Sequence, residues 1–395
     1  MKISEKQFKL LTIFFSIPLA LFMIYGYLKA FQTTADGFLR WQECACILHG
    51  IYPMDIVLGR IPAIEEFGVF DSSITNTPWS YLLTNILYPG FLPWSAARIW
   101  SICLFTACAA LCALFLYKKF FQSSRNKLLS IFLCIQFFVH FGWGSSLNKL
   151  NNGMFCVLAI TAVLILMEYY PHTTKNEILI AFLMVIAMLK PQVALLFYIP
   201  LLIQKYYKSI FLSGGILLAS WLGLSAIVNI SPLTILLEQF QAGVDSKYTA
   251  VYVYCGILDF LTMFGIKASL IMLIEAALFI PVVFILCYRF RHTSTWVIFS
   301  IPALFMLFWC YHHNTEVQIV GILMVCIAYL LFTEPTLSKI EQAYCIFLLL
   351  FNLCPISYLY YEISPLIPFF QRILYLFGLI LILKHYRSYT SLKSH

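Results

Sequence analysis

The chain has 395 residues, of which 62% are hydrophobic and only 11% are charged. Soluble globular proteins carry about 25% charged residues, and 25 basic plus 17 acidic side chains are too few to cover a chain of this size with a polar surface. The net charge of +8 comes from basic residues in short loops between apolar runs, which is typical of cytoplasmic membrane loops rather than of a nucleic-acid binder. Composition therefore excludes a soluble protein.

The apolar residues occur in runs near the roughly 20 residues that a helix needs to cross a bilayer, which excludes a membrane β-barrel. The first run, 8–28, is interpreted as an uncleaved span, and the polar stretch 32–77 follows it as a long outer loop with amphipathic helices. Further runs follow at 95–117, 128–144, 153–168, 178–204, 209–230, 267–289, 296–311, 317–333, 342–361 and 366–383. We expect an all-α polytopic bundle of about ten full spans plus a pair of half-length helices, in a single domain covering 1–395, with 78–92 interfacial or re-entrant.

Basic clusters between the runs predict the orientation, because cytoplasmic loops are rich in Lys and Arg. The five clusters are Lys2, Lys6 and Lys9; Lys118, Lys119, Arg125 and Lys127; Lys205 and Lys208; Arg289 and Arg291; and Lys384, Arg387 and Lys393. Both termini, including the basic tail 384–395, are then cytoplasmic and the 32–77 loop is outside, in a multi-pass protein of the cell (inner) membrane.

This orientation requires the run 178–204 to enter the membrane and return. Lys190-Pro191 lies at its middle, and a half of about 12 residues reaches roughly 18 Å, which is half a bilayer. The pattern predicts two half-length helices that meet at Lys190-Pro191-Gln192. The alternative is one long kinked helix, which would put one basic cluster on the wrong side.

Polar residues on the outer side are the candidates for function. Asp36, Arg40 and Glu43 are spaced i, i+4 and i+7, so a helix places them on one stripe. Asp36 as a helix cap and Glu43 as an ion-pair partner of Arg40 are the structural alternatives. Lys190 in an apolar run needs an anion or a water-filled cavity, unless it snorkels to the surface.

Other outer residues have less specific signals. Arg98, near the outer start of its span, can anchor to lipid headgroups or bind a substrate phosphate. His312 and His313 lie in an outer turn, where a hydrogen bond to phosphate is favoured over a metal site because no third ligand is evident. Thirteen cysteines lie mostly inside apolar runs and predict neither a disulfide framework nor a zinc site. No metal site and no cofactor are predicted, although the need for a divalent ion stays open.

In chain order, several motifs together resemble a known family of membrane enzymes. They are Asp36 in the acidic outer loop, Leu48-His49-Gly50-Ile51-Tyr52-Pro53, Thr77-Pro78-Trp79, Leu189-Lys190-Pro191-Gln192 and Tyr311-His312-His313. Over residues 8–333 this order is similar to the polyprenol-phosphate-sugar-dependent glycosyltransferases of the C superfamily, most closely glycosyltransferase family 87. Two motifs depart from the family: Thr77-Pro78-Trp79 stands where its Tyr-Pro-Pro is expected, and Leu150-Asn151-Asn152-Gly153 stands where it has Gly-Gln-x-Asn.

The resemblance implies an enzyme that moves mannose or a related hexose from a polyprenyl-phosphate donor to a lipid or glycan acceptor on the outer membrane face, with a carboxylate of the first outer loop as base. That carboxylate is Asp36, and Glu43 is the alternative. Anomeric inversion is expected by analogy with inverting glycosidases. The residues expected to bind the donor phosphate are Lys190, Gln192, His312, His313 and Arg98, and those expected to contact the acceptor or sugar are Arg40, Asn151 and Asn152.

Two other functions stay open at this stage. A transporter or flippase of lipid-linked sugars also uses broken helices, although such carriers usually show two matching halves and this chain has one clear Lys-Pro break. A glycan polymerase or ligase of another superfamily would use an oligosaccharide donor. The expected partners are the polyprenyl-phosphate sugar, the acceptor and the bilayer, with no nucleic acid; the sequence does not indicate an oligomeric state.

Overall fold

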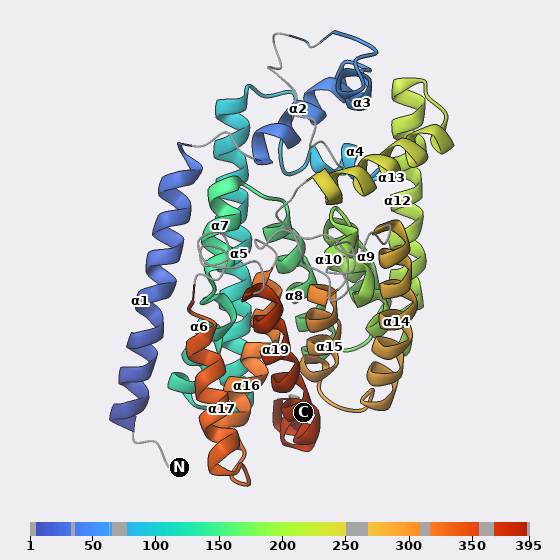
Figure 1. Ribbon diagram of the computed structural model, residues 1–395. Helices are drawn as coiled ribbons and strands as arrows, with labels where there is room; N and C mark the ends of the chain where they lie inside the picture. Colours follow the sequence, from blue (N-terminus) through green and yellow to red (C-terminus); the bar gives the residue numbers. More distant parts are fainter. Residues whose placement is uncertain are drawn as a thin grey trace.

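The computed structural model describes residues 5–32, 36–62, 64, 77–249, 268–308, 317–354 and 367–392. These residues form helices and contain no strand, so the all-α prediction is confirmed for this part of the chain (Figure 1). The α-helices are α1 (Glu5–Ala30), α2 (Asp36–Leu48), α3 (Pro53–Val57), α4 (Ser80–Thr84), α5 (Trp94–Ser124), α6 (Lys127–Phe138), α7 (Phe141–Lys149), α8 (Gly153–Tyr169), α9 (Thr174–Ala187), α10 (Pro191–Ala194), α11 (Tyr198–Ile203), α12 (Tyr207–Val228), α13 (Pro232–Thr249), α14 (Ala268–Arg289), α15 (Thr295–Phe308), α16 (Gly321–Thr333), α17 (Lys339–Phe351) and α19 (Ile367–Lys384). The 3₁₀ helices are η2 (Leu195–Phe197), η4 (Val317–Val320) and η5 (Tyr386–Leu392).

Three of the described helices, α1, α5 and α12, are long and apolar enough to cross a membrane, as expected of a membrane protein. The pair α6 and α7 makes a fourth if the 50° bend between them lies within one span. The expected ten full spans are therefore not confirmed. The run 153–168 forms α8, of 17 residues, and the run 296–311 contains α15, of 14 residues. The run 317–333 is divided between η4 and α16, which has 13 residues.

The run 178–204 folds back on itself, as predicted. α9 ends at Ala187, α10 begins at Pro191, and hydrogen bonds from Lys208 to Thr174 and Glu177 join the two ends of the segment at 2.9 Å each. Pro191 lacks an N–H and disfavours a helical residue before it, so the helix cannot continue through this point. The break therefore lies at the far tip of a hairpin, with Lys190 beside it.

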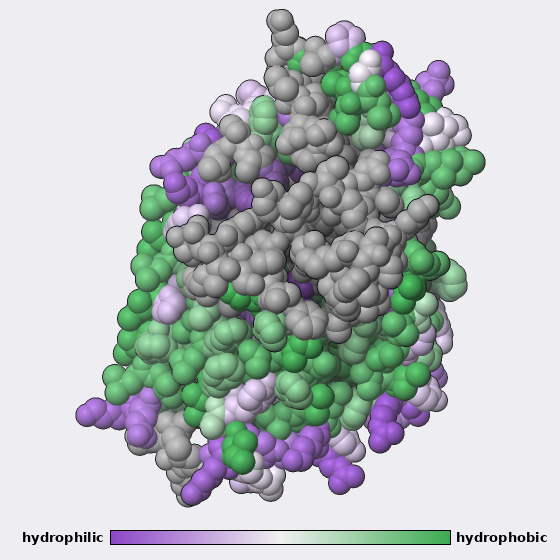
Figure 2. All heavy atoms as spheres, viewed as in Figure 1, coloured by the Kyte–Doolittle hydropathy of each residue, from purple (hydrophilic) through white to green (hydrophobic). Residues whose placement is uncertain are grey.

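The basic clusters of the described residues gather at one end of the molecule, which we call the basic end. α1 begins there and α19 ends there (Figure 1). Figure 2 shows a hydrophilic lower rim at this end, below a broad hydrophobic surface. The contacts that join the clusters are Lys119 over the ring of Tyr170, Lys208 with Thr174, Gln204 with the carbonyl of Arg291, Phe290 with Tyr386, and Phe8 with Phe332. The described basic clusters therefore lie together at one end, as the sequence predicted. That this end faces the cytoplasm stays a prediction.

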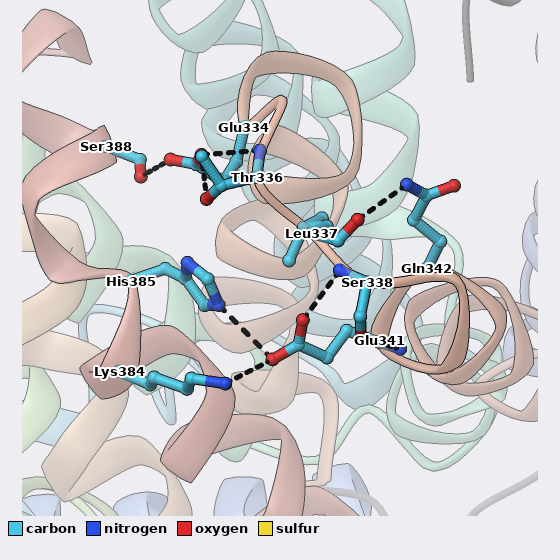
Figure 3. Close-up of polar contacts among 9 residues, drawn as sticks. All are labelled: Glu334, Thr336, Leu337, Ser338, Glu341, Gln342, Lys384, His385 and Ser388. Carbon is cyan, nitrogen blue, oxygen red and sulfur yellow. Dashed lines mark hydrogen bonds and ion pairs between the residues drawn. The ribbon is translucent and has the colours of Figure 1, made fainter.

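Polar contacts hold the C-terminal residues at the basic end (Figure 3). Glu341 forms a capping box with Ser338 at the start of α17 and accepts a hydrogen bond from Lys384 at 2.7 Å. Glu334 accepts a hydrogen bond from Ser388 of η5. The hydrogen bonds that Glu341 accepts, chiefly the one from Lys384, lower its pKa to about 2.

α2, α3, α4 and α13 lie at the opposite end (Figure 1), which we call the site end. Gln239 of α13 donates hydrogen bonds to the hydroxyls of Tyr52 and Tyr81, at 3.2 and 2.7 Å, and so ties α13 to the segments before α3 and in α4. The short α4 and the turns after it confirm that 78–92 is not a full span. Of the polar residues predicted for function, Asp36, Arg40 and Glu43 belong to α2 and so lie at this end.

Candidate functional site

The α2 helix carries the candidate base and is held from two directions. The indole N–H of Trp41 donates to the carbonyl of Leu92 at 2.8 Å. A Cβ on Gly90 would lie 2.5 Å from the backbone N of Ala45, so only glycine lets this turn approach α2 so closely. A Cβ on Gly37 would lie 2.6 Å from the Cβ of Leu150, which shows how tightly the start of α2 packs on the turn between α7 and α8.

Three predicted site residues from three distant segments meet at this turn. The amide nitrogen of Asn151 donates to Oδ2 of Asp36 at 2.6 Å, and Nζ of Lys190 donates to Oδ1 of Asn151 at 2.7 Å. Asn151 is 2% exposed, whereas Asp36 and Lys190 are half-buried. A half-buried carboxylate and a half-buried ammonium group thus lie on the two sides of one buried amide.

The backbone of the turn has an unusual conformation that presents Asn151. Leu150 has φ of 49°, a left-handed conformation that costs a non-glycine residue about 1–2 kcal/mol. The hydroxyl of Tyr88 donates to the carbonyl of Leu150 at 2.5 Å, and the N–H of Asn151 donates to the carbonyl of Ser146 at 2.8 Å. These bonds keep the strained turn in place.

Lys190 is positioned by the hairpin tip. It precedes Pro191 in a non-helical conformation, φ −128° and ψ 88°, as a residue before proline prefers. The indole N–H of Trp79 donates to the carbonyl of Met188 at 2.8 Å, and Ser220 of α12 donates to the carbonyl of Trp79 at 2.7 Å. The Thr77-Pro78-Trp79 motif therefore lies between the hairpin tip and α12, where it supports the lysine.

Arg40 and Glu43 form the ion pair that was the structural alternative for this stripe. Nη1 of Arg40 lies 2.8 Å from both carboxylate oxygens of Glu43, whose side chain is 1% exposed. Burial raises the pKa of Glu43 to about 7, and Arg40 offsets part of that effect. Because its carboxylate is buried and held by Arg40, Glu43 is a poorer candidate base than Asp36, and Arg40 is engaged within the protein.

The remaining predicted residues are less closely connected. Arg98 donates to the carbonyl of Phe31 at 3.0 Å, which anchors the chain just after α1 and does not place its guanidinium on Asn151. Gln192 lies half-buried in the first turn of α10, and Asn152 is buried at the start of α8. His312 and His313 lie outside the described residues.

Arg372 is a residue that sequence reasoning missed. It lies in α19, 2% exposed, beside Gln371 at 4%. Gln371 and Asn352 both contact the hydroxyl of Tyr375, and Asn352 also donates to the carbonyl of Val139 at the bend between α6 and α7. The signal was an arginine inside the apolar run 366–383, since a charge in apolar surroundings is costly unless it is paired.

Comparisons of the chain with models of protein families, with curated proteins and with solved structures found no match. Among the described residues no group of three or more His, Cys, Asp or Glu side chains is arranged to hold a metal ion. The site must therefore be interpreted from its own chemistry.

Proposed function

We propose that the protein is a membrane glycosyltransferase that moves a hexose, with mannose the first choice, from a polyprenyl-phosphate donor to a lipid or glycan acceptor. The observation that carries the proposal is the meeting of Asp36 and Lys190 on the two sides of Asn151. A sugar phosphate needs a base for the acceptor hydroxyl and a cation for the departing phosphate, and these two groups supply both.

In the proposed reaction, Asp36 accepts the proton of the acceptor hydroxyl while the oxygen of that hydroxyl bonds to the anomeric carbon of the sugar. The bond from that carbon to the phosphate oxygen breaks, and the bonding electrons leave with the polyprenyl phosphate. Lys190 stabilises the negative charge of that phosphate. Attack opposite the leaving group inverts the anomeric centre, and no covalent enzyme intermediate is required. Glu43 keeps Arg40 in place and is not the base.

The proposed location follows from the separation of charge along the molecule. Basic clusters at the basic end favour a cytoplasmic position for that end and an extracytoplasmic position for Asp36 and Lys190, in the cell (inner) membrane. A cysteine introduced at Gln192, labelled in intact cells with a membrane-impermeant reagent, tests this orientation. We expect labelling from outside; labelling only after the cytoplasm is opened would contradict it.

The function is tested by transfer of labelled mannose from polyprenyl-phosphate mannose to a lipid and glycan extract, with purified protein in detergent. We expect Asp36→Asn to lower transfer by about 10²- to 10⁴-fold, the usual contribution of a general base. Asp55→Asn is the matched control, because Asp55 lies in the same loop and pairs with Arg60 at 2.9 Å. Full transfer by the Asp36→Asn protein would refute the assignment.

Two arms of the same experiment separate the other functions. A carrier transports without forming product and needs a sealed membrane, so it incorporates no label in detergent. A polymerase or ligase uses an oligosaccharide donor and ignores the monosaccharide donor. Transfer from the monosaccharide donor without a sealed membrane supports the glycosyltransferase.

A further inference from the structure

The side chain of Asn151 makes three hydrogen bonds to groups of the protein itself. Its amide nitrogen donates to Asp36, and its oxygen accepts from both Nζ of Lys190 and the backbone N–H of Gly153, the latter at 2.8 Å. With 2% of the residue exposed, little of it is left for a sugar. The expectation that Asn151 contacts the acceptor or sugar stays a prediction, whereas its bonds to Asp36 and Lys190 are present in the structure.

The chemistry of the neighbours fixes the orientation of this amide. The ammonium of Lys190 and the N–H of Gly153 are donors only, so they must face the amide oxygen. The NH₂ group then faces Asp36, whose ionised carboxylate only accepts hydrogen bonds. Flipping the amide would bring donors against donors on one side and oxygen against oxygen on the other.

We propose that Asn151 is a positioning residue that keeps the carboxylate of Asp36 ionised and couples it to the ammonium of Lys190. The inference rests on the proposed function in taking Asp36 as the base. A charge-assisted bond from the amide to Oδ2 favours the ionised form of the carboxylate. The positive charge on Lys190 polarises the amide and strengthens its N–H as a donor.

Other described groups around Asp36 act on the same carboxylate. Arg40 lies one turn further along α2 and interacts electrostatically with Asp36, and Tyr88 does so from the segment after α4. Arg40 is itself held by Glu43. Changing Asn151 alone alters the link to Lys190 while these neighbours stay in place.

The test replaces Asn151 by Asp, which keeps the size of the side chain. A carboxylate there still accepts from Lys190 and Gly153 but cannot donate to Asp36, and two facing carboxylates raise the pKa of one of them. Asn148→Asp is the matched control: it makes the same change in α7, where Asn148 contacts the hydroxyl of Tyr25 at 3.4 Å. Asn151→Leu removes the donor without adding charge.

Two readouts separate this inference from the proposed function. The first is the pH profile of transfer, whose acidic limb we expect to move up by about one unit or more in Asn151→Asp, with a tenfold or greater loss of kcat near neutral pH. The second readout needs no turnover: infrared difference spectra recorded over a range of pH follow the protonation of carboxyl groups. The band that disappears in Asp36→Asn is the band of Asp36.

We expect that band to titrate at higher pH in Asn151→Asp and Asn151→Leu and to be unmoved in Asn148→Asp. An unmoved band in both Asn151 variants overturns the inference, whether or not the enzyme is active. If the band moves in the Asn151 variants but the wild-type protein transfers no sugar, the coupling is supported and the proposed function is overturned. Thermal unfolding of each variant confirms that it is folded when the band is read.

Discussion

The buried pair of Arg40 and Glu43 allows a prediction about stability, because its dependence on pH changes with the partner that is removed. Nη1 of Arg40 lies 2.8 Å from both oxygens of Glu43, and the two side chains are 12% and 1% exposed. A glutamate can take up a proton when its partner is lost, whereas an arginine cannot lose one. Arg40→Met and Glu43→Gln should therefore respond differently to pH.

The magnitude follows from the pKa of Glu43, which burial raises from 4.5 to about 7. Between these values the folded wild type holds a proton that the unfolded chain has lost, so its free energy of unfolding falls as pH rises and levels off above pH 7. Without Arg40 the pKa of Glu43 rises further, and the decline continues above pH 7 at about 1.4 kcal/mol per unit. Between pH 7 and 9 the gap in the free energy of unfolding between wild type and Arg40→Met should therefore widen by about 2–3 kcal/mol.

Glu43→Gln keeps a neutral group beside Arg40, as protonated Glu43 does, so its free energy of unfolding should not vary between pH 6 and 9 and should stay close to that of the wild type at the acid end of this range. The double variant, Arg40→Met with Glu43→Gln, also lacks the titrating carboxylate and should be equally independent of pH. The assay is thermal unfolding of purified protein in detergent across this pH range. Parallel curves for wild type and Arg40→Met would refute the reasoning.

Two further predictions concern packing and the C-terminal contacts. Gly144→Ala would place a Cβ 2.2 Å from the carbonyl oxygen of Phe22 in α1, so we expect the free energy of unfolding to fall by about 1–3 kcal/mol or more. Gly214 in α12 has open space around it, so Gly214→Ala should raise the free energy of unfolding by up to about 1 kcal/mol. Equal effects would contradict the close contact of α1 and α7. Hydrogen bonds, chiefly from Lys384, lower the pKa of Glu341 from 4.5 to about 2, so its stabilising contribution is complete above pH 4.5 and is lost as pH falls toward 2. Hydrogen exchange at the end of α19, around Lys384 and His385, should rise over that interval, and in Glu341→Gln it should already be fast at neutral pH. Unchanged exchange in that variant would show that other contacts hold the end of α19.

Sequence alone was enough for properties that depend on composition and on neighbours along the chain. The scarcity of charge predicted apolar helices, the Lys190-Pro191 pair predicted the break of the hairpin, and the spacing of Arg40 and Glu43 predicted their pairing as one alternative. Each follows from hydropathy, from the missing N–H of proline or from helical periodicity, which are local. Helix lengths were less predictable, because an apolar run does not reveal a bend such as the one between α6 and α7.

Only the tertiary structure decided which of the candidates belong together. Asp36, Asn151 and Lys190 are far apart in the chain, and they meet because Gly37 packs on Leu150 while the hairpin carries Lys190 to the same turn. Such contacts depend on long-range packing, for which a single sequence contains no periodic signal. The same packing buries Glu43 against Arg40 and leaves Asp36 half-exposed, a distinction between two carboxylates of one helix that their spacing does not contain.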